Sequence, residues 1–226
     1  MNSGLAIVLA AFAAVAAPDR LPPIDQCLSD PSFVGYLSEL LDAVRQQDRE
    51  LLLAALADDI LVDFGGGSGK AAFAATWALD RSPSSRVWDE LGRALALGCA
   101  SSGDAYVAPS AIAQLDSARA GFATLLAIVP GTQLRKEPRD DSEAVATLDW
   151  DLLTSSEQVA SGEWLAVRLD DGRSGFVRRS QVRSPLDYRA VFEKRGERWL
   201  MTAFAAGADA TALPFARRRS YSARQA

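Results

Sequence analysis

Apolar side chains recur at helical spacing through the first half of the chain. The first predicted helix begins near Ser29, with Asp30 and Pro31 in capping positions. Its apolar face consists of Phe33, Leu37, Leu40, Leu41 and Val44. The same spacing predicts helices over 48–56, 70–79 and 87–97, and residues 59–64 predict a strand that ends at the glycine-rich stretch 65–69.

The sequence pattern changes near residue 125, where short apolar runs begin to alternate with turn sequences. The predicted strands cover 126–129, 133–135, 145–149, 164–169, 175–177, 188–193 and 198–204. A turn sequence at 170–173 connects the predicted strands 164–169 and 175–177, and another at 194–197 connects 188–193 and 198–204. The Asp171-Gly172 pair favours a tight hairpin. A helix-rich half followed by an all-β half predicts the α+β fold class.

The N-terminus carries an uncharged apolar run over residues 5–17. It is shorter than the roughly 20 residues that a membrane-spanning helix needs, and it is typical of a secretory signal. The small residues Ala14-Val15-Ala16 favour cleavage after residue 16. We therefore expect an exported protein, periplasmic or secreted, with an uncleaved anchor or a cytoplasmic tail as the alternative.

Two cysteines, Cys27 and Cys99, lie 72 positions apart. In an exported chain they favour a structural disulfide, which would stabilise the fold by roughly 4 kcal/mol through loop closure. The alternatives are two inert thiols or a reactive thiol, and no basic neighbour in the sequence indicates a lowered thiol pKa.

The ionisable composition excludes several classes of chemistry. The chain has 24 basic and 29 acidic residues, a net charge of −5, and no histidine. Histidine triads, histidine general bases and histidine metal ligands are therefore excluded, and general affinity for nucleic acid is not expected. The carboxylates and the two distant cysteines match no common metal spacing, so we expect neither a metal nor a cofactor.

Residues 129–138 and 162–177 together resemble the bacterial SH3-type domain. An apolar-Arg pair and a following proline open the segment, and the Trp164 strand, the Asp-Gly turn and Gly175-Phe176-Val177 close it. The resemblance covers about residues 129–184 and implies a small SH3-like β-barrel. The predicted divisions are a signal peptide at 1–16, a mainly helical α+β domain at 17–124, the barrel at 125–185, a β-hairpin at 186–206 packing on one of the two domains, and a flexible tail at 207–226.

Members of that family bind cell-wall peptide, other peptide segments or their own neighbouring domains. The resemblance therefore implies a non-catalytic binding protein of the bacterial envelope, with peptidoglycan or envelope peptides and proteins as partners. The acidic net charge indicates no nucleic-acid partner, and the short apolar run at 5–17 indicates no stable membrane insertion after processing. Trp164 and Phe176 are the candidate ligand-binding residues, although Trp164 also fits the barrel core. A barrel that only braces its own N-terminal domain is a further alternative.

A second resemblance concerns the segments on either side of the barrel. Residues 48–73, with a helix, a strand and a glycine-rich turn into another helix, are similar to the opening of the cone-shaped nuclear-transport-factor-like superfamily. Residues 188–193 and 199–204 resemble its closing hairpin, so the barrel would be an insertion. The plainer interpretation, preferred slightly, is that the hairpin extends the barrel or packs beside it.

The cone-like resemblance implies an alternative function, namely a small-ligand-binding protein or a carboxylate-dependent enzyme. Its pocket would lie around Asp63, Phe64, Trp77 and Trp88, although the helical spacing of Trp77 and Trp88 is more typical of a core. The glycine-rich stretch before Lys70 fails the phosphate-loop pattern because Ala71 stands where the magnesium-binding hydroxyl is needed. The sequence therefore leaves two candidate sites in different halves of the chain.

Overall fold

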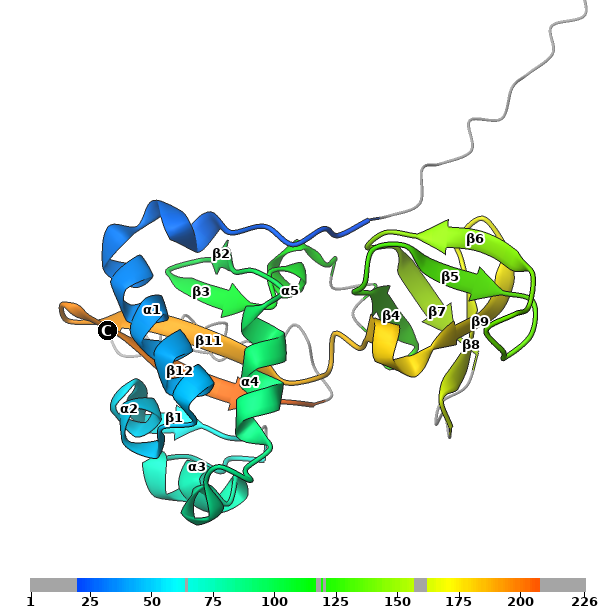
Figure 1. The fold of residues 1–226 in the computed structure, drawn as a ribbon. Coiled ribbons are helices and arrows are strands. Elements are labelled where there is room, and N and C mark those ends of the chain that lie inside the picture. Colours follow the sequence, from blue (N-terminus) through cyan, green and yellow to red (C-terminus); the bar gives the residue numbers. More distant parts are fainter. Residues whose placement is uncertain (1–19, 64, 117–118, 120, 157–161, 208–226) are drawn as a thin grey trace, which may run out of the picture.

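A computed structural model describes residues 20–63, 65–116, 119, 121–156 and 162–207. The chain forms two sheets that lie side by side, and the helices gather on the first of them (Figure 1). This confirms the α+β class. The predicted signal peptide and most of the predicted tail lie outside the described residues, and within those residues no helix is both long and apolar enough to cross a membrane.

The helices follow the apolar spacing closely. They are α1 (Pro31–Gln46), α2 (Arg49–Ala54), α3 (Lys70–Thr76), α4 (Val87–Leu95) and α5 (Ala111–Gln114), with 3-10 turns η1 (Gln26–Ser29), η2 (Leu79–Arg81) and η4 (Arg179–Gln181). Asp30 caps α1, and Asp48 caps α2, each by accepting backbone N–H bonds from the first turn. Polar caps therefore set both helix starts where the sequence places them.

The first sheet has the strand order β1-β12-β11-β3-β2. Its strands are β1 (Leu56–Leu61), β2 (Ala100–Ser102), β3 (Ala105–Ala108), β11 (Arg189–Arg195) and β12 (Arg198–Ala205). The hairpin β11–β12 thus lies at the centre of this sheet, and the preference for a hairpin beside the barrel is wrong. Because β1 runs parallel to β12 with Leu56 opposite Met201, the strand begins three residues earlier than predicted.

The second sheet has the strand order β10-β4-β7-β8-β9-β5-β6. Its strands are β4 (Thr124–Ala127), β5 (Thr132–Arg135), β6 (Ala144–Leu148), β7 (Leu152–Ser155), β8 (Trp164–Arg168), β9 (Ser174–Arg178) and β10 (Val182–Arg183). Among the described residues the end strands β6 and β10 do not pair with each other. The expected closed SH3-like barrel is therefore replaced by an open sheet, since the two-residue β10 pairs only with β4.

Local features of the expected barrel are nevertheless present in this sheet. Strands β8 and β9 form the predicted hairpin, and Gly172 in its turn has a φ of 90°. A Cβ atom on Gly175 would lie 2.4 Å from the backbone oxygen of Arg135, so this position has room only for glycine. The hairpin pattern thus predicts its own neighbourhood correctly and the closure of the sheet incorrectly.

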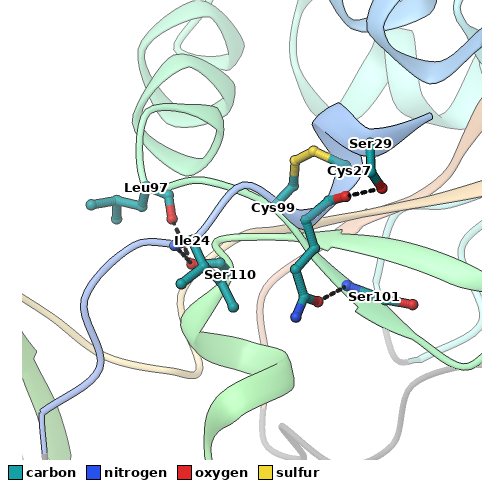
Figure 2. The surroundings of a disulfide bond; sticks show 8 residues. Ile24, Cys27, Ser29, Leu97, Cys99, Ser101 and Ser110 are labelled. Atoms are coloured by element: carbon teal, nitrogen blue, oxygen red, sulfur yellow. Dashed lines mark hydrogen bonds between the residues drawn. A yellow bond between two sulfur atoms is a disulfide. The ribbon is translucent and has the colours of Figure 1, made fainter. Parts of the chain in front are cut away.

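The N-terminal segment joins the two sheets. Nε of Arg20 donates to the buried carboxylate of Asp151 over 3.2 Å, and the backbone N–H of Leu21 donates to the backbone oxygen of Trp150, between β6 and β7 of the second sheet. Further along, the backbone N–H of Ile24 donates to the Ser110 hydroxyl at the first sheet (Figure 2). We call residues 20–27 the strap, because its two ends bind different halves of the molecule.

A disulfide between Cys27 and Cys99 fixes the strap to the first sheet. The two Cα atoms lie 5.8 Å apart, and both side chains are buried. The side-chain oxygen of the neighbouring Gln26 accepts the backbone N–H of Ser101 and so continues the attachment along β2. The structure agrees with the disulfide that the sequence predicts.

Candidate functional site

A cleft of about 820 Å³ separates helix α4 from the second sheet. Its walls come from α4, from the segment that runs from β9 through η4 to β10, and from the residues just before β11. The lining is Arg86, Glu90, Arg93, Leu125, Ile128, Gly162, Glu163, Leu165, Arg178, Arg179, Ser180, Val182, Arg183, Ser184, Asp187, Tyr188 and Ala206. Arginine is the most frequent charged residue in this lining, whereas the whole chain is acidic.

The α4 wall carries two arginines that share one carboxylate. The guanidinium of Arg86 lies 3.2 Å from a carboxylate oxygen of Glu90, and that of Arg93 lies 3.9 Å from the same oxygen. The side chain of Glu90 is 15% exposed, whereas those of Arg86 and Arg93 are 81% and 66% exposed. The helical spacing of these residues places an excess of positive charge at this edge of the cleft.

On the opposite wall, Arg178 is held by two acids and one aromatic ring. It forms ion pairs with Asp140 and Glu163, and its guanidinium lies 4.8 Å from the ring centre of Trp164. The hydrogen bond to Asp140 is the largest cause that raises the pKa of Arg178. Its charge is therefore largely neutralised within the protein.

Arg183 occupies a different environment from its neighbours. Only 9% of this residue is exposed, and Nη2 donates to the backbone oxygen of Tyr188. Among the described residues no carboxylate lies within ion-pair distance of its guanidinium. Burial lowers the pKa of Arg183, and the nearby charge of Asp187 partly offsets this effect. A buried guanidinium without a paired carboxylate is costly for a protein unless an anion completes its environment.

Tyr188 connects the cleft to the aromatic core behind it. Its ring centre lies 4.7 Å from that of Trp77 and 5.3 Å from that of Phe204. Trp77 and Phe204 belong to the large apolar core of the first half. The cleft therefore has an aromatic wall, Tyr188, whose ring packs against the core of the first half.

The structure distributes the predicted pocket residues over different environments. Trp77 and Trp88 are buried in the core of the first half, and neither indole N–H has a hydrogen-bond partner within the described residues. Asp63 is exposed, and it accepts the backbone N–H of Gly67 within the glycine-rich turn. Phe64 lies outside the described residues. Of this set, Trp77 approaches the cleft, through Tyr188.

The two residues predicted from the SH3-type resemblance are also separated. Trp164 supports Arg178 at the margin of the cleft. Phe176 is half-buried and lines another groove, of about 480 Å³, together with Ser155 and Arg168. Neither arrangement tests a ligand-binding role, so both assignments stay predictions.

The arginines of the cleft form no sequence motif, so the sequence does not indicate that they share a site. They come from α4 and from residues 178–183, about 90 positions further along the chain. The sequence gives no signal for the burial of Arg183, because alternation along a strand would place its side chain on the face opposite the buried Val182.

Asp25 and the two cysteines offer ligand atoms within 4.8 Å of one another. Both sulfur atoms are committed to the disulfide, and a metal thiolate requires a free, deprotonated sulfur. In the structure described, the two cysteines therefore form the disulfide that attaches the strap to the first sheet, and the sulfur atoms do not serve as metal ligands.

No protein family model matches the chain, and no curated protein matches it. Two solved structures are similar to it, both NTF2-like proteins of unknown function. The one from Pseudomonas putida shares 13% identity with a TM-score of 0.31, covering 80% of this chain and 87% of that chain. The one from Burkholderia pseudomallei shares 14% identity with a TM-score of 0.30, covering 80% of this chain and 93% of that chain. Neither likeness carries information about a ligand.

These findings correct the main interpretation of the sequence. Among the described residues the second sheet stays open, and no family model, of an SH3-type domain or of any other kind, matches the chain. The SH3-type assignment and the envelope-binding function that rested on it are therefore wrong. The physical reason is that the matching residues specify only a twisted hairpin: a strand with a Trp, an Asp-Gly turn, and a glycine where two strands approach closely. Sheets of several topologies contain such a hairpin.

Proposed function

We propose that this chain is a small-ligand-binding protein that holds an organic anion in the arginine-lined cleft. The observation that carries the proposal is Arg183, a buried guanidinium at the cleft without a paired carboxylate among the described residues. A carboxylate or phosphate matches the fork of N–H donors that a guanidinium presents. Binding such an anion would give Arg183 a directly paired opposite charge, whereas Asp187 acts on it without forming an ion pair.

The rest of the lining supports an anion with an apolar body. Leu125, Ile128, Leu165 and Val182 line the same cleft, together with the aromatic ring of Tyr188. Small-molecule sites combine apolar walls with a few fixed polar groups, and they occur preferentially where two structural units meet. We propose binding without catalysis, which the lack of histidine supports.

The disulfide and the N-terminal sequence support a location for this protein. A buried disulfide is typical of an oxidising compartment. Together with the apolar run at 5–17, it supports export to the periplasm or secretion.

The proposal is tested with octanoate, a monocarboxylate with an apolar chain, by isothermal titration calorimetry. We expect saturable binding by the wild type and a loss of about tenfold or more in affinity for Arg183→Gln. The matched control is Arg45→Gln, which removes an exposed arginine of α1 that pairs with Asp42. It should bind octanoate as the wild type does.

Folding of each variant is checked by circular dichroism and thermal unfolding. If Arg183→Gln does not fold, Arg183→Lys keeps the charge but removes the planar fork, and it should still weaken binding. Absence of octanoate binding by the wild type, or equal binding by a folded Arg183 variant, would overturn the proposal.

A further inference from the structure

The cations of the cleft form two separate sets, one on each half of the molecule. Arg86 and Arg93 belong to the α4 wall, and Arg183 belongs to the end of the second sheet. Arg178 contributes little free charge, because Asp140 and Glu163 both pair with it. An anion bound at one wall would therefore leave the positive charge of the other wall uncompensated.

The α4 set has one carboxylate for two guanidinium groups. Glu90 lies within 3.2 Å of Arg86 and within 3.9 Å of Arg93, and the second distance is too long for a direct hydrogen bond. Since both arginine side chains are mostly exposed, they are able to turn toward a second anionic group without unfolding the helix. This wall is suited to accept an anion in addition to Glu90.

The two walls lie within electrostatic range of each other. The charges of Glu90 and Arg93 on α4 both influence the pKa of Arg183 on β10, in opposite directions. Leu125, Leu165 and Val182 of the second sheet line the same cleft, and their side chains offer no hydrogen bonds. The wall beside Arg183 therefore offers apolar surface to the body of a ligand.

We infer that the ligand is an elongated dianion with an apolar spacer, one anionic group on Arg183 and the other on Arg86 and Arg93. This inference rests on the proposed function and narrows its ligand class. Such a ligand would compensate both sets of cations at once and would place its spacer on the apolar wall. It would also bridge the two halves of the molecule.

The inference is tested by comparing suberate with octanoate, which have the same number of carbon atoms but two and one carboxylates. We expect suberate to bind the wild type about tenfold more tightly, because the second charged contact adds to the first. The variant Arg86→Gln/Arg93→Gln should abolish the advantage of suberate over octanoate. The control variant Arg45→Gln/Arg139→Gln, which removes exposed arginines elsewhere, should keep that advantage.

The two proposals fail in different ways. If octanoate binds through Arg183 but suberate binds no more tightly, the dianion is wrong and the proposed function stands. The same conclusion follows if suberate keeps its advantage in the folded Arg86→Gln/Arg93→Gln variant. If neither compound binds the wild type, the proposed function fails, and the dianion fails with it.

Discussion

At the scale of single residues, the second sheet depends on the absence of a side chain at Gly175. A Cβ atom there would lie 2.4 Å from the backbone oxygen of Arg135, at the place where β9 meets β5. We predict that Gly175→Ala destabilises the protein by about 1–3 kcal/mol, because backbone atoms must move apart to admit the methyl group. Urea unfolding followed by circular dichroism measures the change.

The matched control is Gly35→Ala in the interior of α1. A Cβ atom at Gly35 meets nothing within 4 Å, so the substitution should stabilise the protein by about 0.5–1 kcal/mol through higher helix propensity. A Gly175→Ala variant as stable as the wild type would show that β5 and β9 are not packed as closely as described.

At the scale of elements, helix α1 begins at the Asp30 cap, and the contribution of this cap to stability depends on pH. The Asp30 carboxylate accepts N–H bonds from Ser32 and Phe33 as well as the Ser32 hydroxyl. The hydrogen bond from the Ser32 side chain is the largest cause that lowers the pKa of Asp30 below its usual value of 3.8. Its contribution to stability is therefore present above pH 3.8 and is lost as the pH falls through the lower, folded-state pKa.

We predict that Asp30→Ala lowers the thermal unfolding midpoint at neutral pH by roughly 2–4 °C, because the first turn loses its acceptor. Differential scanning calorimetry from about pH 6 to about pH 3 measures the effect. The difference between wild type and variant should shrink toward the acid end. Asp30→Asn serves as the control, since it keeps an acceptor but cannot titrate. A difference that stays constant with pH would contradict the ionised cap.

At the scale of the whole molecule, the strap and its disulfide hold the chain's N-terminal segment against both halves. The Cys27–Cys99 bond closes a loop of 72 positions. We predict that Cys27→Ser/Cys99→Ser lowers the free energy of unfolding by roughly 4 kcal/mol, because the unfolded chain regains the entropy of that loop. Urea unfolding with and without dithiothreitol measures it.

Dithiothreitol should shift the wild type toward the double variant and leave the variant unchanged. An equal shift in both proteins would mean that the reductant acts by another route. Unchanged stability of the wild type under full reduction, confirmed by thiol titration, would contradict the predicted contribution of the disulfide.

Much of the first half was predictable, because its signals are local. The Asp30 cap, the apolar face of α1 and the start of α3 at Lys70 all depend on residues within a few positions of one another. The start of β1 at Leu56 was not predictable in this way. It depends on pairing with Met201, about 145 positions away, and that pairing overrides the helical spacing of the preceding residues.

The sequence by itself determined helices α1 to α4, the disulfide partners, the α+β class and the β8–β9 hairpin, because short-range spacing and turn chemistry fix each of them. The tertiary structure alone decided which sheet received β11 and β12, and that the second sheet stays open. It also decided that Arg86, Arg93 and Arg183 face one cleft. The physical reason is that strand partners and binding sites are formed by contacts between distant segments, which no local pattern encodes.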